Sequence, residues 1–245
     1  MYKLAAIDLD GTMLNRYGVV TKETKQTIKQ TIEKGTDVII ASGRPIDSIK
    51  TIAEEIGSNN YFIAGNGSLI YDIKNDQIMY EKFLNKQKVL EIAKICEENS
   101  ISYNIYTEET IIAKQLKHNV LYYYKENLKK EEKNKTSITL VEDMIEYIKN
   151  TENNKFLKIT ICDETKSIFN SVLRKLAKVT DIDILDVSHM SRKTIKQGTE
   201  EVSIEYFYTE ISIKGADKWT AIEYLINKLN INKEDVIAIR RQYEW

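Results

Sequence analysis

The chain has 245 residues, of which 42% are hydrophobic and 30% charged, a balance typical of globular proteins with a buried core. Its 36 basic and 37 acidic side chains leave a formal net charge of -1, so charge gives no reason to expect nucleic acid or an anionic membrane as a partner. The sequence has no run of about 18 apolar residues, no secretory signal and only two cysteines, which favours a cytoplasmic protein without a disulfide framework.

Strands and helices are predicted to alternate over the first 70 residues. Buried strands are expected at 4–9, 38–41 and 61–64, with helices at about 21–34 and 47–56 between them. Strands joined by helices favour right-handed crossovers and a parallel sheet covered on both faces. Ligands of such sheets bind beyond the carboxyl ends of the strands, so the residues that follow each strand are the site candidates.

The middle of the chain changes to an order of elements that predicts a separate α+β domain. A hairpin is expected at 69–83, followed by helices at 86–99, 141–149 and 164–178 and strands at 102–106, 110–113, 156–162, 182–187 and 202–213. A polar helical stretch is expected to continue through Lys133. The charged run 125–135 is interpreted as a solvated helix end or loop, in preference to a basic binding patch, because acidic residues interrupt it.

After Gly215 the first pattern returns, with a helix expected at 216–229 and a strand at 235–239. The predicted fold class is therefore α/β. A Rossmann-like, doubly wound parallel sheet would form the core from residues 1–83 and 214–245, and the separate α+β domain, residues 84–213, would be inserted into it.

Asp8 and Asp10 follow the first strand and are separated by one residue. In an extended chain such positions point to the same side, and two adjacent carboxylates repel each other unless a cation or a proton compensates them. A magnesium ion would do so, because it prefers oxygen ligands. Alternatively, Asp10 could hold a proton and act as a general acid, and the pair could also be a simple acidic turn.

Small and basic residues that suit an anion follow the other predicted strands. Ser42 and Gly43 offer a hydroxyl and a backbone N–H near a helix start, although Ser42 could be an ordinary helix cap. Lys218 is placed at a helix start, where the helix dipole disfavours a cation, so it suggests a bound anion or a solvated side chain. Asn66 is either a turn residue or a polar group that faces the same crevice.

Together these residues comprise a carboxylate nucleophile, a neighbouring acid or base, a magnesium site and an anion cradle. That set suits phosphoryl transfer through an aspartyl-phosphate. A nucleotide-binding α/β module is disfavoured, because neither G-x-x-x-x-G-K-[ST] nor G-x-G-x-x-G occurs.

Four segments resemble the haloacid dehalogenase-like superfamily, specifically its Cof-type phosphatases: DLDGT at 8–12, ASGRP at 41–45, GNG at 65–67 and KGADK at 214–218. The resemblance implies that Asp8 attacks phosphorus and binds Mg²⁺, while Asp10 protonates the leaving group, activates water and binds the metal. It also implies a phosphate cradle formed by Leu9, Ser42, Gly43 and Lys218. Arg44 and Asn66 are implied, more weakly, as substrate-binding residues.

The spacing of these segments agrees with the relatives that carry an α/β (C2-type) cap. Ser42 lies 34 residues after Asp8, which leaves room for one helix and no inserted domain. Lys218 lies 176 residues after Ser42, so the cap is expected between these two motifs. By resemblance, the cap closes over the crevice and selects the leaving group.

The expected fourth motif of the family, Gly-Asp-x-x-Asn-Asp, does not follow the last predicted strand. Arg240 and Arg241 stand there instead, and this would weaken the magnesium site. Two functions are therefore expected as alternatives. One is a magnesium-dependent phosphatase of small phosphorylated metabolites, sugar phosphates by resemblance. The other is a phosphate-binding relative that is truncated at this motif, through a frameshift or otherwise, and catalytically impaired.

Overall fold

The structure is a computed structural model that describes residues 2–15, 17–128, 130–132, 135–185, 191–197 and 200–240, the side chains of 191–197 and 200–204 excepted. The chain divides into two compact units. The first consists of Met1–Lys82 and Ala216–Trp245, and the second of Phe83–Gly215. Within the described ranges, no helix combines the length and the apolar character that crossing a bilayer requires.

The first unit is built on a six-stranded sheet in the order β13-β1-β2-β3-β4-β5. The first four strands in this order run parallel, whereas β4 pairs antiparallel with both β3 and β5. The strands are β1 (Leu4–Ile7), β2 (Asp37–Ala41), β3 (Tyr61–Ala64), β4 (Leu69–Asp72), β5 (Gln77–Glu81) and β13 (Val236–Ile239).

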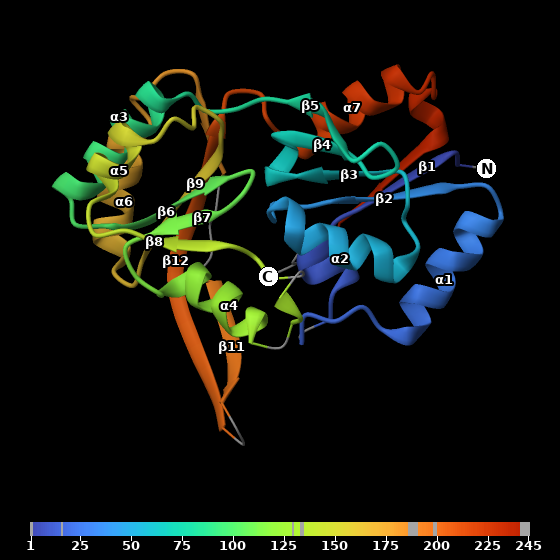
Figure 1. The fold of residues 1–245 in the computed structure, drawn as a ribbon, viewed down its shortest axis with the longest axis horizontal. Coiled ribbons are helices and arrows are strands. Elements are labelled where there is room, and N and C mark those ends of the chain that lie inside the picture. Colours follow the sequence, from blue (N-terminus) through green and yellow to red (C-terminus); the bar gives the residue numbers. More distant parts are fainter. Residues whose placement is uncertain are drawn as a thin grey trace. The chain divides into compact units, whose positions relative to one another are not determined.

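Helices cover both faces of this sheet, as Figure 1 shows. On one face α1 (Lys22–Glu33) and α2 (Ile46–Ile56) contact β2 and β3, and on the other face α7 (Lys218–Lys228) contacts β3 and β4. The start of α1 is set locally, because the Thr21 side chain accepts a hydrogen bond from the backbone N–H of Thr24 and so caps the helix. The predicted α/β class with a doubly wound, mostly parallel sheet is confirmed.

The second unit contains a seven-stranded sheet in the order β10-β12-β9-β6-β7-β8, with β11 paired to β12. Its pairings are antiparallel except that of β7 with β8. The strands are β6 (Ser102–Thr107), β7 (Ile111–Ala113), β8 (Ile138–Leu140), β9 (Phe156–Asp163), β10 (Ile182–Ile184), β11 (Ser191–Gln197) and β12 (Glu200–Ile213).

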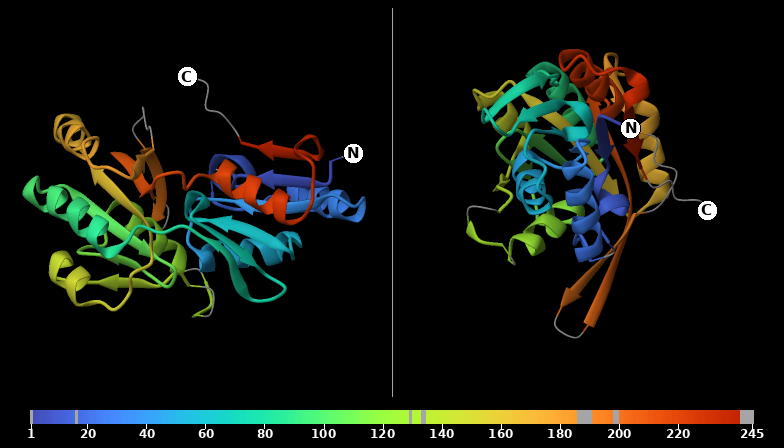
Figure 2. Two further views of the ribbon diagram at one scale, coloured as in Figure 1. Left: turned by 90° about the horizontal axis from the view of Figure 1, so that it is seen from above. Right: turned by 90° about the vertical axis from the view of Figure 1, so that its right-hand side faces the viewer.

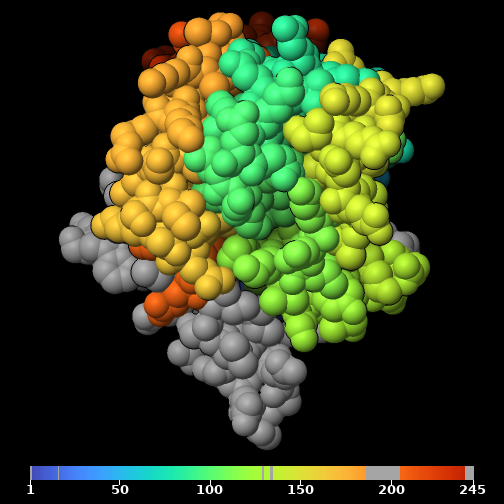
Figure 3. Space-filling view, turned by 90° about the vertical axis from the view of Figure 1, so that its left-hand side faces the viewer, coloured from blue at the N-terminus to red at the C-terminus, as the bar shows by residue number. Residues whose placement is uncertain are grey.

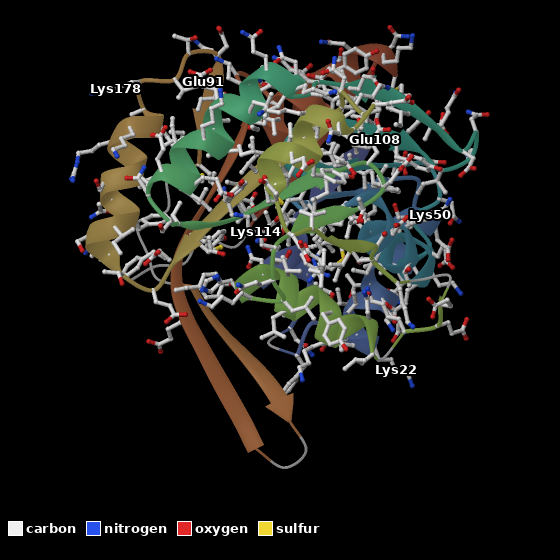
Figure 4. The ribbon with its side chains drawn as sticks, turned by 60° about the vertical axis from the view of Figure 1, so that its left-hand side comes forward. Lys22, Lys50, Glu91, Glu108, Lys114 and Lys178 are labelled. Atoms are coloured by element: carbon white, nitrogen blue, oxygen red, sulfur yellow. The ribbon has the colours of Figure 1, made fainter. Side chains whose placement is uncertain are left out.

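Three helices cover one face of this second sheet, as Figure 2 shows: α3 (Lys86–Glu98), α5 (Met144–Asn150) and α6 (Lys166–Leu176). Apolar side chains of all three join a buried core with β6 and β9, and both cysteines are fully buried in this unit. The outer surfaces of the three helices form the upper and middle part of the view in Figure 3, coloured orange, green and yellow. Charged side chains such as Glu91 and Lys178 project outward from this surface in Figure 4.

The polar helical stretch expected through Lys133 is longer than the helix found, because α4 (His118–Asn127) ends at Asn127, and Lys133 itself lies outside the described residues. The Asn127 side chain accepts a hydrogen bond from the backbone N–H of Thr136 at 2.8 Å and donates one to its carbonyl at 2.7 Å. These two bonds hold the returning chain against the end of α4. Nothing in the charged pattern of this segment signals that long-range contact.

Two strands are absent from the sequence prediction. The strand β8 has only three residues, too few to show an alternating pattern, and it pairs in parallel with the distant β7. The strand β11 is rich in polar residues and is defined by its antiparallel register with β12. Strand propensity of this kind depends on the partner rather than on the segment itself.

A close backbone contact holds the start of α7 against the loop after β3. Gly67 has a φ of +102°, and a Cβ at this position would lie 2.1 Å from the carbonyl oxygen of Asp217, the N-terminal cap of α7. Gly57 also has a positive φ, +74°, but a Cβ there would meet no atom within 4 Å.

We expect Gly67→Ala to lower the free energy of unfolding by more than about 2 kcal/mol, since it adds a steric overlap to the strain of a positive φ. Gly57→Ala is the matched control and should cost only about 1 kcal/mol, from the backbone conformation alone. Chemical denaturation of both variants measures the difference. Equal losses would contradict the close approach at Gly67.

The first residue of α4, His118, is buried and has a positive φ of +48°. Its ring contacts the ring of Tyr206, and its Nε2 lies 3.4 Å from a carboxylate oxygen of Glu164. Burial lowers the pKa of His118, and this effect exceeds the opposing influence of Glu164.

The unfolded chain therefore takes up a proton at this histidine before the folded protein does. Stability should fall as the pH drops below about 6.5, with a slope of at most about 1.4 kcal/mol per pH unit. His118→Asn, which tolerates a positive φ, should show a flatter dependence between pH 7 and 5. Denaturation at several pH values tests this, and identical slopes for the two proteins would refute it.

Candidate active site

The sequence-predicted residues lie at the carboxyl ends of the parallel strands in the first unit. Asp8 follows β1, Ser42 follows β2, and the loop Gly65–Gly67 follows β3. Lys218 is the first residue of α7. These positions lie far apart in the chain and are brought together by the parallel order of the strands.

Asp8 and Lys218 form a direct ion pair across 210 positions of sequence. The Asp8 side chain is only 12% exposed, and its second carboxylate oxygen accepts a hydrogen bond from the Thr12 hydroxyl at 3.2 Å. Its backbone N–H donates to the carbonyl of Ile239 at 3.0 Å, which fixes the start of the loop to β13. Asp8 is thus a largely buried carboxylate with a lysine ammonium beside it.

Asp10 lies in a tight turn and takes a different basic partner. Its ψ of 115° and the φ of +78° at Gly11 match a type II turn, in which a glycine is favoured at the second central position. Arg44 donates to both carboxylate oxygens of Asp10, from Nε at 3.0 Å and from Nη2 at 2.8 Å. Arg44 also donates from Nη1 to the hydroxyl of Ser48 at 3.2 Å.

The loops after β2 and β3 are tied to each other by backbone hydrogen bonds. The N–H of Asn66 donates to the carbonyl of Ser42 at 3.0 Å, and the N–H of Gly65 donates to the carbonyl of Arg44 at 3.1 Å. A Cβ on Gly43 would lie 2.6 Å from Oδ1 of Asn66. Only glycine therefore allows the Asn66 amide to lie against this loop.

The structure refines three of the sequence interpretations. Ser42 is not the cap of the following helix, because Pro45 occupies that position and the Ser42 hydroxyl accepts from the N–H of Arg44 at 3.2 Å. Lys218 begins α7 as expected, and its anionic neighbour is Asp8. Arg44, which the resemblance places among the substrate-binding positions, forms an ion pair with Asp10.

Thr12 and Ser48 are contacts that the sequence interpretation missed. Thr12 follows Asp8 by four residues, and Ser48, in the first turn of α2, follows Arg44 by four, although Arg44 itself precedes that helix. That spacing was the available signal, because it brings a short hydroxyl side chain back over the residue that it supports.

The donor set at Asp8 fits a magnesium ion that keeps water or substrate oxygens among its ligands. Mg²⁺ is commonly held in this way by one or two carboxylates. Among the described residues, no group of three or more His, Cys, Asp and Glu side chains could hold a metal, so an all-protein cage does not fit. The Asp10 carboxylate, in turn, is engaged by Arg44.

The expected change in the fourth motif falls on residues 240–245. Arg240 follows β13 and is exposed, and residues 241–245 lie outside the described part of the chain.

Comparison with known proteins identifies one family over nearly the whole chain. The family described as haloacid dehalogenase-like hydrolase matches residues 5–239. The phosphatase YwpJ of Bacillus subtilis is 24% identical over 97% of this chain and 82% of its own length. A protein of Buchnera aphidicola is 34% identical over 108 residues, which span 44% of this chain and 38% of that protein.

The fold is similar to that of a solved structure. A solved structure of a sugar phosphatase of subclass IIB of this superfamily superposes with a TM-score of 0.69, covering 96% of this chain and 79% of that one. Its sequence is 17% identical, so this likeness is one of fold.

Removal of the cation beside Asp8 should destabilise the protein, because it leaves a largely buried carboxylate without its partner. We expect Lys218→Met to lower the free energy of unfolding by about 2 kcal/mol. The double variant Asp8→Asn/Lys218→Met should recover most of that loss, because the uncompensated charge is gone. Lys228→Met, at the exposed far end of the same helix, is the control. Additive losses in the double variant would show that the pair has no energetic coupling.

Proposed function

Because the chain belongs to the haloacid dehalogenase-like hydrolases, we propose that it is a phosphatase that hydrolyses phosphate monoesters of small metabolites through an aspartyl-phosphate on Asp8. The observation that carries this proposal is the pairing of the largely buried Asp8 carboxylate with Lys218 at the carboxyl end of β1, which lies between β13 and β2. A carboxylate that faces a lysine can receive a phosphoryl group whose negative charge the lysine then neutralises.

In the first half of the proposed reaction, an Asp8 carboxylate oxygen attacks phosphorus. The bond from phosphorus to the ester oxygen breaks, and that oxygen leaves with the electron pair and takes a proton from Asp10. Lys218, the Ser42 hydroxyl and the N–H groups of Leu9 and Gly43 hold the phosphoryl oxygens.

In the second half, a water oxygen attacks phosphorus and gives a proton to the Asp10 carboxylate. The bond from phosphorus to the Asp8 oxygen breaks, which restores the Asp8 carboxylate and releases inorganic phosphate. Mg²⁺, held by the Asp8 carboxylate and the main-chain carbonyl of Asp10, would supply positive charge that balances the phosphoryl group. Asn66 would contact the substrate beside the cradle.

The proposed substrates are small phosphorylated metabolites, with sugar phosphates first. The phosphatase YwpJ and the subclass IIB sugar phosphatase, similar to this chain in sequence and in fold respectively, support that choice. No nucleic acid or membrane is needed for the reaction, and we propose a cytoplasmic location.

A second candidate is a phosphate-binding relative with impaired turnover. It is favoured by the absence, among the described residues, of a third carboxylate that joins Asp8 and Asp10. In that case Lys218 and the cradle would bind phosphate, while the metal-dependent chemistry would be weak.

Phosphate release from sugar phosphates and from an aryl phosphate, with and without Mg²⁺, separates the two candidates. We expect release that requires Mg²⁺ and that falls more than about 10³-fold in Asp8→Asn, because the nucleophile is lost. Asp76→Asn, in the exposed hairpin between β4 and β5, is the matched control and should keep full activity. A folded wild-type protein that binds phosphate without turnover would support the second candidate.

A further inference from the structure

We propose that Arg44 is the positioning residue for Asp10, which it holds in the orientation that proton transfer needs, and that it is not a substrate-binding residue. This inference rests on the proposed phosphatase function. It assigns to Arg44 a role that acts through another side chain rather than on the substrate.

The two partners differ sharply in their exposure. The Arg44 side chain is 4% exposed, whereas the Asp10 side chain is 62% exposed. An exposed aspartate in a turn would otherwise sample several rotamers. Two parallel N–H···O bonds from a planar guanidinium remove that freedom, because both carboxylate oxygens are held at once.

Arg44 is itself fixed from several sides. Its backbone N–H donates to the Ser42 hydroxyl, its carbonyl accepts from Gly65, and its Nη1 donates to the Ser48 hydroxyl on α2. The loop after β2, the loop after β3 and the first turn of α2 therefore all hold Arg44. A guanidinium held in this way can fix the orientation of the Asp10 carboxylate.

Three of the five guanidinium N–H groups of Arg44 are engaged within the protein, and the Nε/Nη2 edge is held by Asp10. Nε and Nη2 both donate to Asp10, and Nη1 donates to Ser48. Bidentate recognition of a phosphate needs two adjacent N–H groups directed at the ligand. The site's phosphate-binding cation is then Lys218, which lies next to the proposed nucleophile.

A positioning role predicts a specific dependence on the leaving group. An alkoxide leaving group needs the proton that Asp10 supplies, whereas a p-nitrophenolate leaves without it. Arg44→Lys keeps a positive charge but loses the planar fork. We expect it to lower kcat/KM for an alkyl phosphate by about 10- to 100-fold, and to leave kcat/KM for p-nitrophenyl phosphate within about twofold.

Three controls sharpen this experiment. Asp10→Asn should show the same leaving-group pattern, and Arg44→Lys/Asp10→Asn should be no worse than Asp10→Asn alone. Arg174→Lys, the same change at an exposed position of α6, should leave kcat/KM unchanged for both substrates. An equal loss for both substrates, or a raised KM for p-nitrophenyl phosphate, would show that Arg44 binds the phosphate and would overturn the proposal.

A second measurement does not depend on turnover. The Nε–H of Arg44 should give a protected ¹H–¹⁵N resonance, identified by its loss in Arg44→Lys, that shifts in Asp10→Asn. The absence of that resonance in the folded wild-type protein, or its indifference to Asp10→Asn, would refute the pair itself. Wild-type protein without activity on either substrate would instead refute the phosphatase function, and the resonance would then decide on Arg44 alone.

Discussion

The first unit is organised around one electrostatic constraint, which is that two carboxylates stand two positions apart directly after the strand β1. Asp8 and Asp10 would repel each other if they shared one side of the chain without compensation. The fold meets this constraint by giving each a separate cation from a distant part of the sequence, Lys218 for the first and Arg44 for the second. The turn at Gly11 makes that separation possible, because it directs Asp10 away from the direction of the strand. The chemistry proposed for the two residues follows from these different surroundings.

Much of the fold was predictable from the sequence, for reasons that lie in single segments. Buried apolar runs such as 38–41, and helices with clear caps such as that of Thr21, carry their structure locally. The elements that were missed depend on a distant partner, as β8 depends on β7. The same division holds at the site. The residue types were enough to predict the cluster of polar residues after the strands. The ion pair of Arg44 with Asp10 was not predictable in this way, because the sequence pattern does not show the direction of a side chain.

Backbone contacts give the site a precision that side chains alone would not provide. Gly43 lets the Asn66 amide lie against its loop, and Gly67 lets the cap of α7 approach at a distance that any Cβ would forbid. Lys218 is thereby brought to its partner by main-chain packing. The charged groups differ in burial, and the arginine that we propose to position Asp10 is the most enclosed of them. An exposed carboxylate that acts as an acid or base must be held in one orientation, and a buried, hydrogen-bonded partner can hold it there.

The pairing of β1 with β13 has a consequence for the biosynthesis of the protein. About 230 residues separate these neighbouring strands, so at typical translation rates roughly 10 to 50 s pass between the appearance of one and of the other. During that interval β1 lacks one of its two neighbours, and Asp8 lacks its lysine. The inserted unit, with its own buried core, is complete earlier and can fold while the chain is still being made. Asp8 is therefore made 210 residues before its lysine partner and reaches its final surroundings only after the inserted unit has been made.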